Sequence, residues 1–185
     1  MFQLIFISVL SLPFLAFWTE DFAVRTVEFV DLQRFMGEWY EIAYLDNSWE
    51  ESCHRSKTLT YTLKSNGEIE VKNECKMNKD QKKEEISKGI AWVEDPRSNA
   101  KWKISFFPFS FFKWLTTTNF WIIILADDYS YAVATDSTGN YLWILSRAKS
   151  LPDAVFQEIL NKINVAVPKV DTKKIKFIQT KNPID

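Results

Sequence analysis

The chain has 185 residues, a formal net charge of −1 at pH 7, and 46% hydrophobic residues. This length supports one domain with a sizeable core, and the near-zero charge argues against nucleic acid as a partner because it provides no basic field for phosphates. Aromatic residues make up 16% of the chain, which suits a cavity lined with flat apolar faces.

Residues 1–18 are almost entirely apolar and resemble an export signal. Although no Lys or Arg precedes this run and no Ala-x-Ala follows it, we expect cleavage after about Ala16; the alternative is an uncleaved N-terminal anchor. An exported chain meets oxidising conditions, where two cysteines predict a disulfide between Cys53 and Cys75. The alternative is a nucleophilic thiol, for which only His54 is adjacent as a partner.

Eight segments alternate between apolar and polar residues with the two-residue period of a strand. They span residues 39–45, 57–63, 69–75, 85–93, 101–107, 120–125, 131–135 and 141–147. The pair Asn66-Gly67 predicts a tight hairpin turn, and residues 95–99 and 136–140 are clusters of turn-forming residues. Short strands joined by hairpins predict an all-β fold, an eight-stranded up-and-down antiparallel barrel.

After the eighth strand the apolar period becomes that of a helix. Ser150 is the expected N-cap, with Asp153 as its capping-box partner and Pro152 in the first turn. The apolar stripe of this helix comprises Val155, Phe156, Ile159, Leu160 and Ile163. We expect the stripe to pack outside the barrel on residues 141–147; binding of a partner helix is the alternative. Residues 175–180 can pair back on the barrel, and 181–185 form a tail.

Three short motifs occur in order at barrel spacing. Gly37-Glu38-Trp39 opens the first strand, Asp128-Tyr129 precedes the seventh, and Arg147 closes the eighth. Together they resemble the signature of the lipocalin family, and residues 89–96 and 103–107 are similar to its bacterial and apolipoprotein-D-like branch. The resemblance implies a lipocalin domain over residues 22–180. It also implies a structural clasp, in which the guanidinium of Arg147 lies on the indole of Trp39.

The resemblance implies binding, storage or transport of a small hydrophobic or amphipathic ligand, a fatty acid or lysophospholipid in the bacterial branch, with a role in membrane maintenance. The candidate ligand-binding residues are Trp143, Tyr141, Ala43, Leu45 and Phe120. Strand parity counted from Trp39 and Arg147 directs the first four of them into the barrel. These side chains can instead fill a solid floor. The alternative function is therefore a non-catalytic structural or membrane-tethered interaction module with a filled barrel.

Residues 108–115, between the fifth and sixth strands, are rich in large apolar side chains. Those expected at the barrel mouth are Phe109, Phe111, Phe112 and Trp114. Because this connection lies at the open end of an up-and-down barrel, exposing them to water is costly. We expect the loop either to fold inward as a lid or to contact a membrane surface.

The sequence indicates no enzyme, metal site or cofactor. His54 is the sole histidine, and no Gly-rich phosphate loop is present. The paired carboxylates Glu84-Glu85 and Asp127-Asp128 are expected to point to opposite faces of a strand or to cap a turn. We expect the protein to be exported, either to the periplasm or by secretion. Association with the membrane, on the outer-membrane side, is an alternative. The oligomeric state is not predicted.

Overall fold

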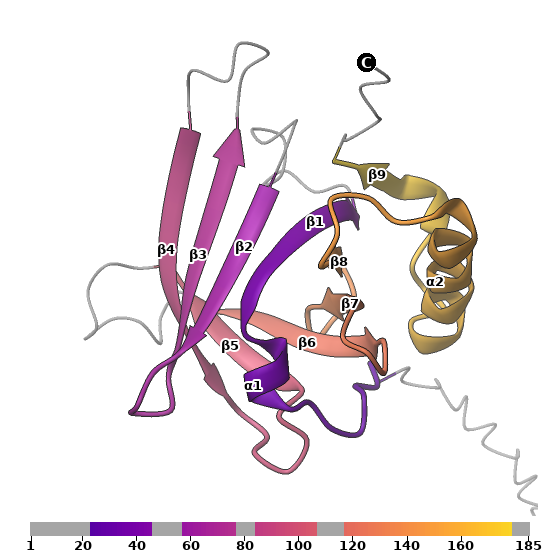
Figure 1. The fold of residues 1–185 in the computed structure, drawn as a ribbon. Coiled ribbons are helices and arrows are strands. Elements are labelled where there is room, and N and C mark those ends of the chain that lie inside the picture. Colours follow the sequence, from indigo (N-terminus) through magenta and orange to yellow (C-terminus); the bar gives the residue numbers. More distant parts are fainter. Residues whose placement is uncertain (1–22, 46–56, 77–83, 107–116, 179–185) are drawn as a thin grey trace, which may run out of the picture.

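A computed structural model of the chain describes residues 23–45, 57–76, 84–106 and 117–178 (Figure 1). The barrel strands are β1 (Gly37–Leu45), β2 (Lys57–Leu63), β3 (Ile69–Lys76), β4 (Glu84–Val93), β5 (Lys101–Ser105), β6 (Thr118–Leu125), β7 (Tyr131–Thr135) and β8 (Leu142–Ser146). Each strand pairs with the next, and β1 pairs antiparallel with both β2 and β8, which closes the sheet. The predicted eight-stranded up-and-down barrel is therefore confirmed, with shifts of one or two residues at several strand ends.

The helix α2 (Asp153–Ala166) lies outside the barrel (Figure 1). Its buried side chains are Phe156, Ile159 and Ile163, which share one apolar cluster with Leu142 and Ile144 of β8. The predicted packing of this stripe on the outer face of β8 is confirmed. The physical reason is strand alternation, which points successive side chains to opposite faces. Leu142 and Ile144 face outward, whereas Trp143 and Leu145 belong to the cluster inside the barrel.

The predicted start of this helix is wrong. The N-cap is Pro152, which makes no side-chain capping hydrogen bond, so Ser150 and Asp153 do not form a capping box. Pro152 has a φ of −57° and introduces the helix two residues after the predicted cap. Asp153 then lies in the first turn, where a carboxylate interacts favourably with the helix dipole.

After α2 the chain returns to the barrel through a 3-10 helix (Thr172–Lys174) and the short strand β9 (Ile175–Phe177). β9 pairs antiparallel with the last three residues of β1, from Ala43 to Leu45. The expectation that residues 175–180 pair back on the barrel is confirmed for Ile175–Phe177. β1 thus has β2 as its neighbour along its first half and β9 along its second.

A β-bulge in β1 changes which residues of this strand face the barrel interior, so part of the predicted interior is wrong. Glu41 pairs with Leu145, but the next pair is Ala43 with Ile144, so Ile42 is an extra residue in this ladder. An extra residue reverses the alternation that follows it. The expectation that Ala43 and Leu45 face the interior is therefore wrong, since both belong to the cluster outside the barrel, under α2.

Candidate functional site

One end of the barrel is closed by α1 (Leu32–Phe35), a short helix that the sequence analysis did not predict (Figure 1). The carboxylate of Asp31 caps it by accepting from the backbone N–H groups of Gln33 and Arg34 at 2.9 and 3.3 Å. Phe35 is fully buried, and its carbonyl accepts a hydrogen bond of 2.8 Å from the indole nitrogen of Trp39. The helix therefore inserts an aromatic ring into the closed end of the barrel.

The Asp128-Tyr129 motif holds α1 in place from the turn between β6 and β7. The hydroxyl of Tyr129 accepts a 2.8 Å hydrogen bond from the backbone N–H of Asp31. The guanidinium of Arg34 lies 4.0 Å from the centre of the Tyr129 ring and donates at 2.8 Å to the carbonyl of Asp127. The motif thus fastens the closed end of the barrel.

Arg147 and Trp39 are brought together at this end. The central guanidinium carbon of Arg147 lies 3.8 Å from the Trp39 ring centre. Its nitrogens also donate to four backbone carbonyls, those of Arg34 (2.8 Å), Phe35 (3.0 Å), Met36 (2.9 Å) and Glu38 (2.6 Å). Gly37 lies beside the guanidinium with a φ of +94°, a conformation that favours glycine. The cation of Arg147, in the loop after β8, thus contacts both α1 and β1.

The lower half of the barrel interior is filled by aromatic rings. Phe35 lies 4.8 Å from Trp39, 5.2 Å from Trp102 and 5.6 Å from Tyr61, measured between ring centres. Phe120 continues the series at 5.6 Å from Trp102. Since Phe120 is only 4% exposed and has rings on both sides, its position favours a filling role.

The series of rings ends at Trp143 and Tyr141. Trp143 lies 5.9 Å from Phe120 and is half-buried, and the Tyr141 ring stacks on it at 6.2 Å with an interplanar angle of 9°. Trp143 pairs with Ala134 of β7 and with Tyr44 of β1, which the bulge turns inward. Trp143 therefore joins the filled lower half to the upper part of the interior.

The opposite wall of the interior, formed by β1, β2 and β3, carries polar groups. Glu41 is 3% exposed, and its carboxylate lies 2.9 Å from the ammonium of Lys57. Tyr61 is 1% exposed, and burial, followed by the charge of Glu41, raises the pKa of its hydroxyl, which therefore stays protonated at neutral pH. Strand parity counted from Trp39 also places Glu41 inside the barrel, but it was not extended to Lys57, Tyr61 or Asn73. Extending the same parity through the Asn66-Gly67 hairpin would have found them.

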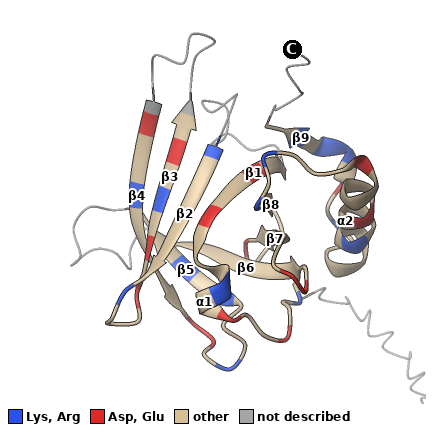
Figure 2. Cartoon of the chain, viewed as in Figure 1, with Lys and Arg blue, Asp and Glu red and all other residues tan. Residues whose placement is uncertain are grey.

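The strands on the two sides of the barrel also differ in their charged residues. β6, β7 and β8 contain no Asp, Glu, Lys or Arg, whereas charged residues are distributed over β2, β3, β4 and β5 (Figure 2). Most of these charges lie on the outer face, because they alternate with interior residues such as Val71 and Trp102. Inside the barrel, the polar wall on the β1–β3 side consists of Glu41, Lys57, Tyr61 and Asn73, and the aromatic wall on the β6–β8 side consists of Phe120 and Trp143. Such a lining suits an amphipathic molecule.

Gly89 of β4 allows a close approach inside the barrel. A Cβ at this position would lie 2.7 Å from the backbone oxygen of Ser105 and 2.9 Å from the ring of Phe106. We expect Gly89→Ala to lower the free energy of unfolding by about 1–3 kcal/mol, because the backbone of β5 must move. Denaturant unfolding measures this, with Ser87→Ala, the preceding inward position of β4, as the control. Equal stability of Gly89→Ala and wild type would show that β5 moves at no cost.

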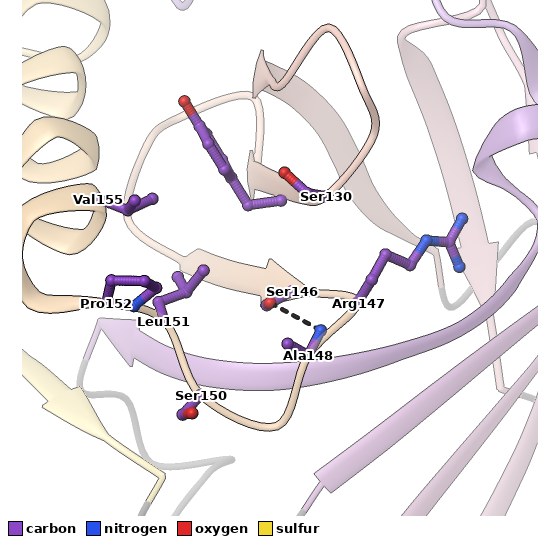
Figure 3. Close-up of a pocket in the computed structure, with 9 residues that line it drawn as sticks. Ser130, Ser146, Arg147, Ala148, Ser150, Leu151, Pro152 and Val155 are labelled. Atoms are coloured by element: carbon purple, nitrogen blue, oxygen red, sulfur yellow. Dashed lines mark hydrogen bonds between the residues drawn. The ribbon is translucent and has the colours of Figure 1, made fainter.

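A separate hollow of about 390 Å³ lies outside the barrel, between the start of α2 and the ends of β7 and β8. It is lined mainly by apolar groups that include Leu151, Pro152 and Val155 (Figure 3). The hydroxyl of Ser146 accepts a 3.0 Å hydrogen bond from the backbone N–H of Ala148, and the guanidinium of Arg147 points away from the hollow (Figure 3). The hollow therefore offers little for polar recognition.

Several predicted residues lie outside the described part of the chain. These are residues 1–18, Cys53, Phe109, Phe111, Phe112, Trp114 and residues 181–185. Cys75 lies in β3 opposite Lys57 and Glu85, and no cysteine among the described residues is free. Within the same residues no group of three or more His, Cys, Asp or Glu is arranged to hold a metal ion. No helix within them combines the length and apolar character needed to cross a membrane.

The sequence of this chain matches a family model and known proteins. A family model, the Lipocalin-like domain, matches residues 30–179. Temperature-induced lipocalin-1 of Arabidopsis thaliana is 31% identical over 146 residues, which are 78% of this chain and 77% of that protein. The outer membrane lipoprotein Blc of Escherichia coli K12 is 34% identical over 138 residues, 74% of this chain and 73% of that protein.

Among solved structures, insecticyanin from the tobacco hornworm Manduca sexta superposes with a TM-score of 0.64 at 21% identity, covering 83% of this chain and 82% of that one. At this identity the likeness shows the fold alone. It agrees with the barrel and the packed helix described above.

Proposed function

This chain belongs to the lipocalin family, and we propose that it binds a fatty acid or a lysophospholipid in the upper part of its barrel. Family membership implies a small hydrophobic ligand and a non-catalytic binding protein. The proposed role is lipid storage or transport, with membrane maintenance as its purpose. The bacterial relative is named an outer membrane lipoprotein, which supports an exported location.

The observation that carries the proposal is the position of Trp143. Below it the barrel is filled by rings that are almost fully buried, whereas Trp143 itself is half-buried and has Tyr141 stacked on it. An indole face at the end of a packed aromatic series provides a surface for an acyl chain. The Tyr141 hydroxyl is available in the same region to hydrogen-bond a polar headgroup.

We expect Trp143→Ala to weaken the binding of fatty acid or lysophospholipid by about tenfold, because the acyl chain loses the indole face. Trp143→Phe should keep most of the affinity but lose most of the ligand-induced change in Trp fluorescence. Isothermal titration calorimetry measures the first effect and fluorescence titration the second.

The matched control is Trp121→Phe, because Trp121 is in β6 but belongs to the cluster outside the barrel, with the ammonium of Lys101 4.4 Å from its ring centre. This variant should bind as the wild type does. If Trp143→Ala binds with unchanged affinity, the ligand does not contact Trp143. Absence of any lipid binding by the wild type would instead favour a structural or interaction module with a filled barrel.

We also propose that the chain is exported and carries a disulfide between Cys53 and Cys75. The support is the apolar run of residues 1–18, the even cysteine count, and the exported location that the name of the outer membrane relative indicates. Intact mass spectrometry under native and reducing conditions tests both points and identifies co-purifying lipid. A mass that includes residues 1–18 would indicate an anchor, and two free thiols would contradict the disulfide.

A further inference from the structure

Two buried polar atoms of the polar wall make no hydrogen bond with any described residue. They are the hydroxyl oxygen of Tyr61 and the side-chain oxygen of Asn73. Tyr61 is only 1% exposed, so bulk solvent does not replace the missing partner. Buried polar groups normally have partners, because burying one without a partner is costly. A binding site for a polar ligand is one place where such groups are kept.

Strand register places both residues on the interior face. Tyr61 pairs with Val71, and Asn73 pairs with Leu59, so Asn73 is the diagonal neighbour of Tyr61 on the same face of the β2–β3 hairpin. Val71 and Leu59 both belong to the cluster inside the barrel. The Tyr61 ring lies 6.0 Å from Phe120, which itself contacts Trp143. The two polar atoms and the proposed apolar contact surface therefore share one interior.

The charged residues near Tyr61 and Asn73 determine which polar group of a ligand can bind there. Glu41 is paired with Lys57 at 2.9 Å, so this ammonium is already neutralised by a buried carboxylate. Burying a ligand carboxylate or phosphate that has no counter-charge is costly. A hydroxyl carries no charge, and it both donates and accepts hydrogen bonds.

We infer that the barrel prefers an apolar molecule with an uncharged terminal hydroxyl, which lies at Tyr61 and Asn73 while the hydrocarbon body packs on Trp143. The ligand hydroxyl accepts from the Tyr61 hydroxyl and donates to the side-chain oxygen of Asn73. This inference rests on the part of the proposed function that places a small hydrophobic or amphipathic ligand in the barrel. It goes beyond that proposal, since it ranks an alcohol above a fatty-acid anion of equal chain length.

The test compares dodecan-1-ol with dodecanoate, which differ only in the polar end. At neutral pH the wild type should bind the alcohol about tenfold more tightly. Tyr61→Phe, which removes one oxygen atom, should reduce the affinity for the alcohol by about tenfold and leave that for dodecanoate nearly unchanged. Calorimetry or displacement of a fluorescent fatty acid measures these affinities.

Tyr131→Phe is the matched control, because the Tyr131 hydroxyl bonds to Lys162 at 3.0 Å and its ring belongs to the cluster outside the barrel. It should leave both affinities unchanged. Thermal unfolding supplies a second measurement, since Tyr61→Phe removes an unpartnered hydroxyl and should keep or raise the midpoint. A marked fall in the midpoint would mean that the hydroxyl holds the fold, and would overturn the inference.

The failures of the two proposals are distinguishable. If dodecanoate binds as tightly as the alcohol and Tyr61→Phe changes neither, the ranking is wrong while lipid binding in the barrel stands. If neither probe binds to the wild type, both the inference and the proposed function fail.

Discussion

Phe35→Ala is expected to lower the free energy of unfolding by about 3–5 kcal/mol, the range for removing a large aromatic from a packed core. Phe35 is 0% exposed, and its ring contacts Trp39, Tyr61 and Trp102 with centre separations between 4.8 and 5.6 Å. The cavity left behind is bordered by rings that are themselves held by β1, β2 and β5, so the surroundings cannot collapse easily. Urea unfolding followed by Trp fluorescence measures the change.

The control is Phe29→Ala, since Phe29 is in the same N-terminal segment but is 58% exposed. It should change the stability by less than about 0.5 kcal/mol. If Phe35→Ala is no more destabilised than Phe29→Ala, α1 does not stabilise the closed end. A normal unfolding midpoint with weaker lipid binding would instead place the ligand against Phe35.

Arg147→Ala should cost about 2–4 kcal/mol of unfolding free energy, because it removes the cation over Trp39 and the guanidinium donor of the Met36 carbonyl. The Phe35 carbonyl also loses this donor but keeps the hydrogen bond from the Trp39 indole. Arg147→Lys should recover only part of this loss, because an ammonium has neither the planar face nor the spread of donors that reaches four carbonyls. Denaturant unfolding of the two variants measures both effects.

Arg97→Ala is the matched control, since the Arg97 side chain is 93% exposed and pairs with Asp95 of the same turn. Its effect should be within about 0.5 kcal/mol. Full stability of Arg147→Ala would contradict the clasp. Equal stability of Arg147→Lys and the wild type would show that only the positive charge matters, and not the planar guanidinium.

The barrel and its helix could be predicted from the sequence, because the signals for them are local. Two-residue alternation marked all eight strands, Asn66-Gly67 marked one hairpin, and the change of period after Arg147 marked α2 and its apolar stripe. The apolar stripe of α2 must be buried against another surface, and alternation in β8 places Leu142 and Ile144 on the outer face of the barrel. The contact between α2 and β8 could therefore also be predicted from the sequence. Trp39 and Arg147 came from the family resemblance, which specifies their contact.

The side of the barrel wall that the second half of β1 faces could not be predicted from the sequence, because it depends on tertiary packing. The extra residue Ile42 is accommodated because Ala43 and Ile144 pack together under α2, and that choice depends on two strands and a helix at once. The helix α1 is likewise too short for a periodic signal and is held by Tyr129 from a distant turn. The polar wall of Glu41, Lys57, Tyr61 and Asn73 spans three strands, so its composition depends on their register, which no single segment of the sequence specifies.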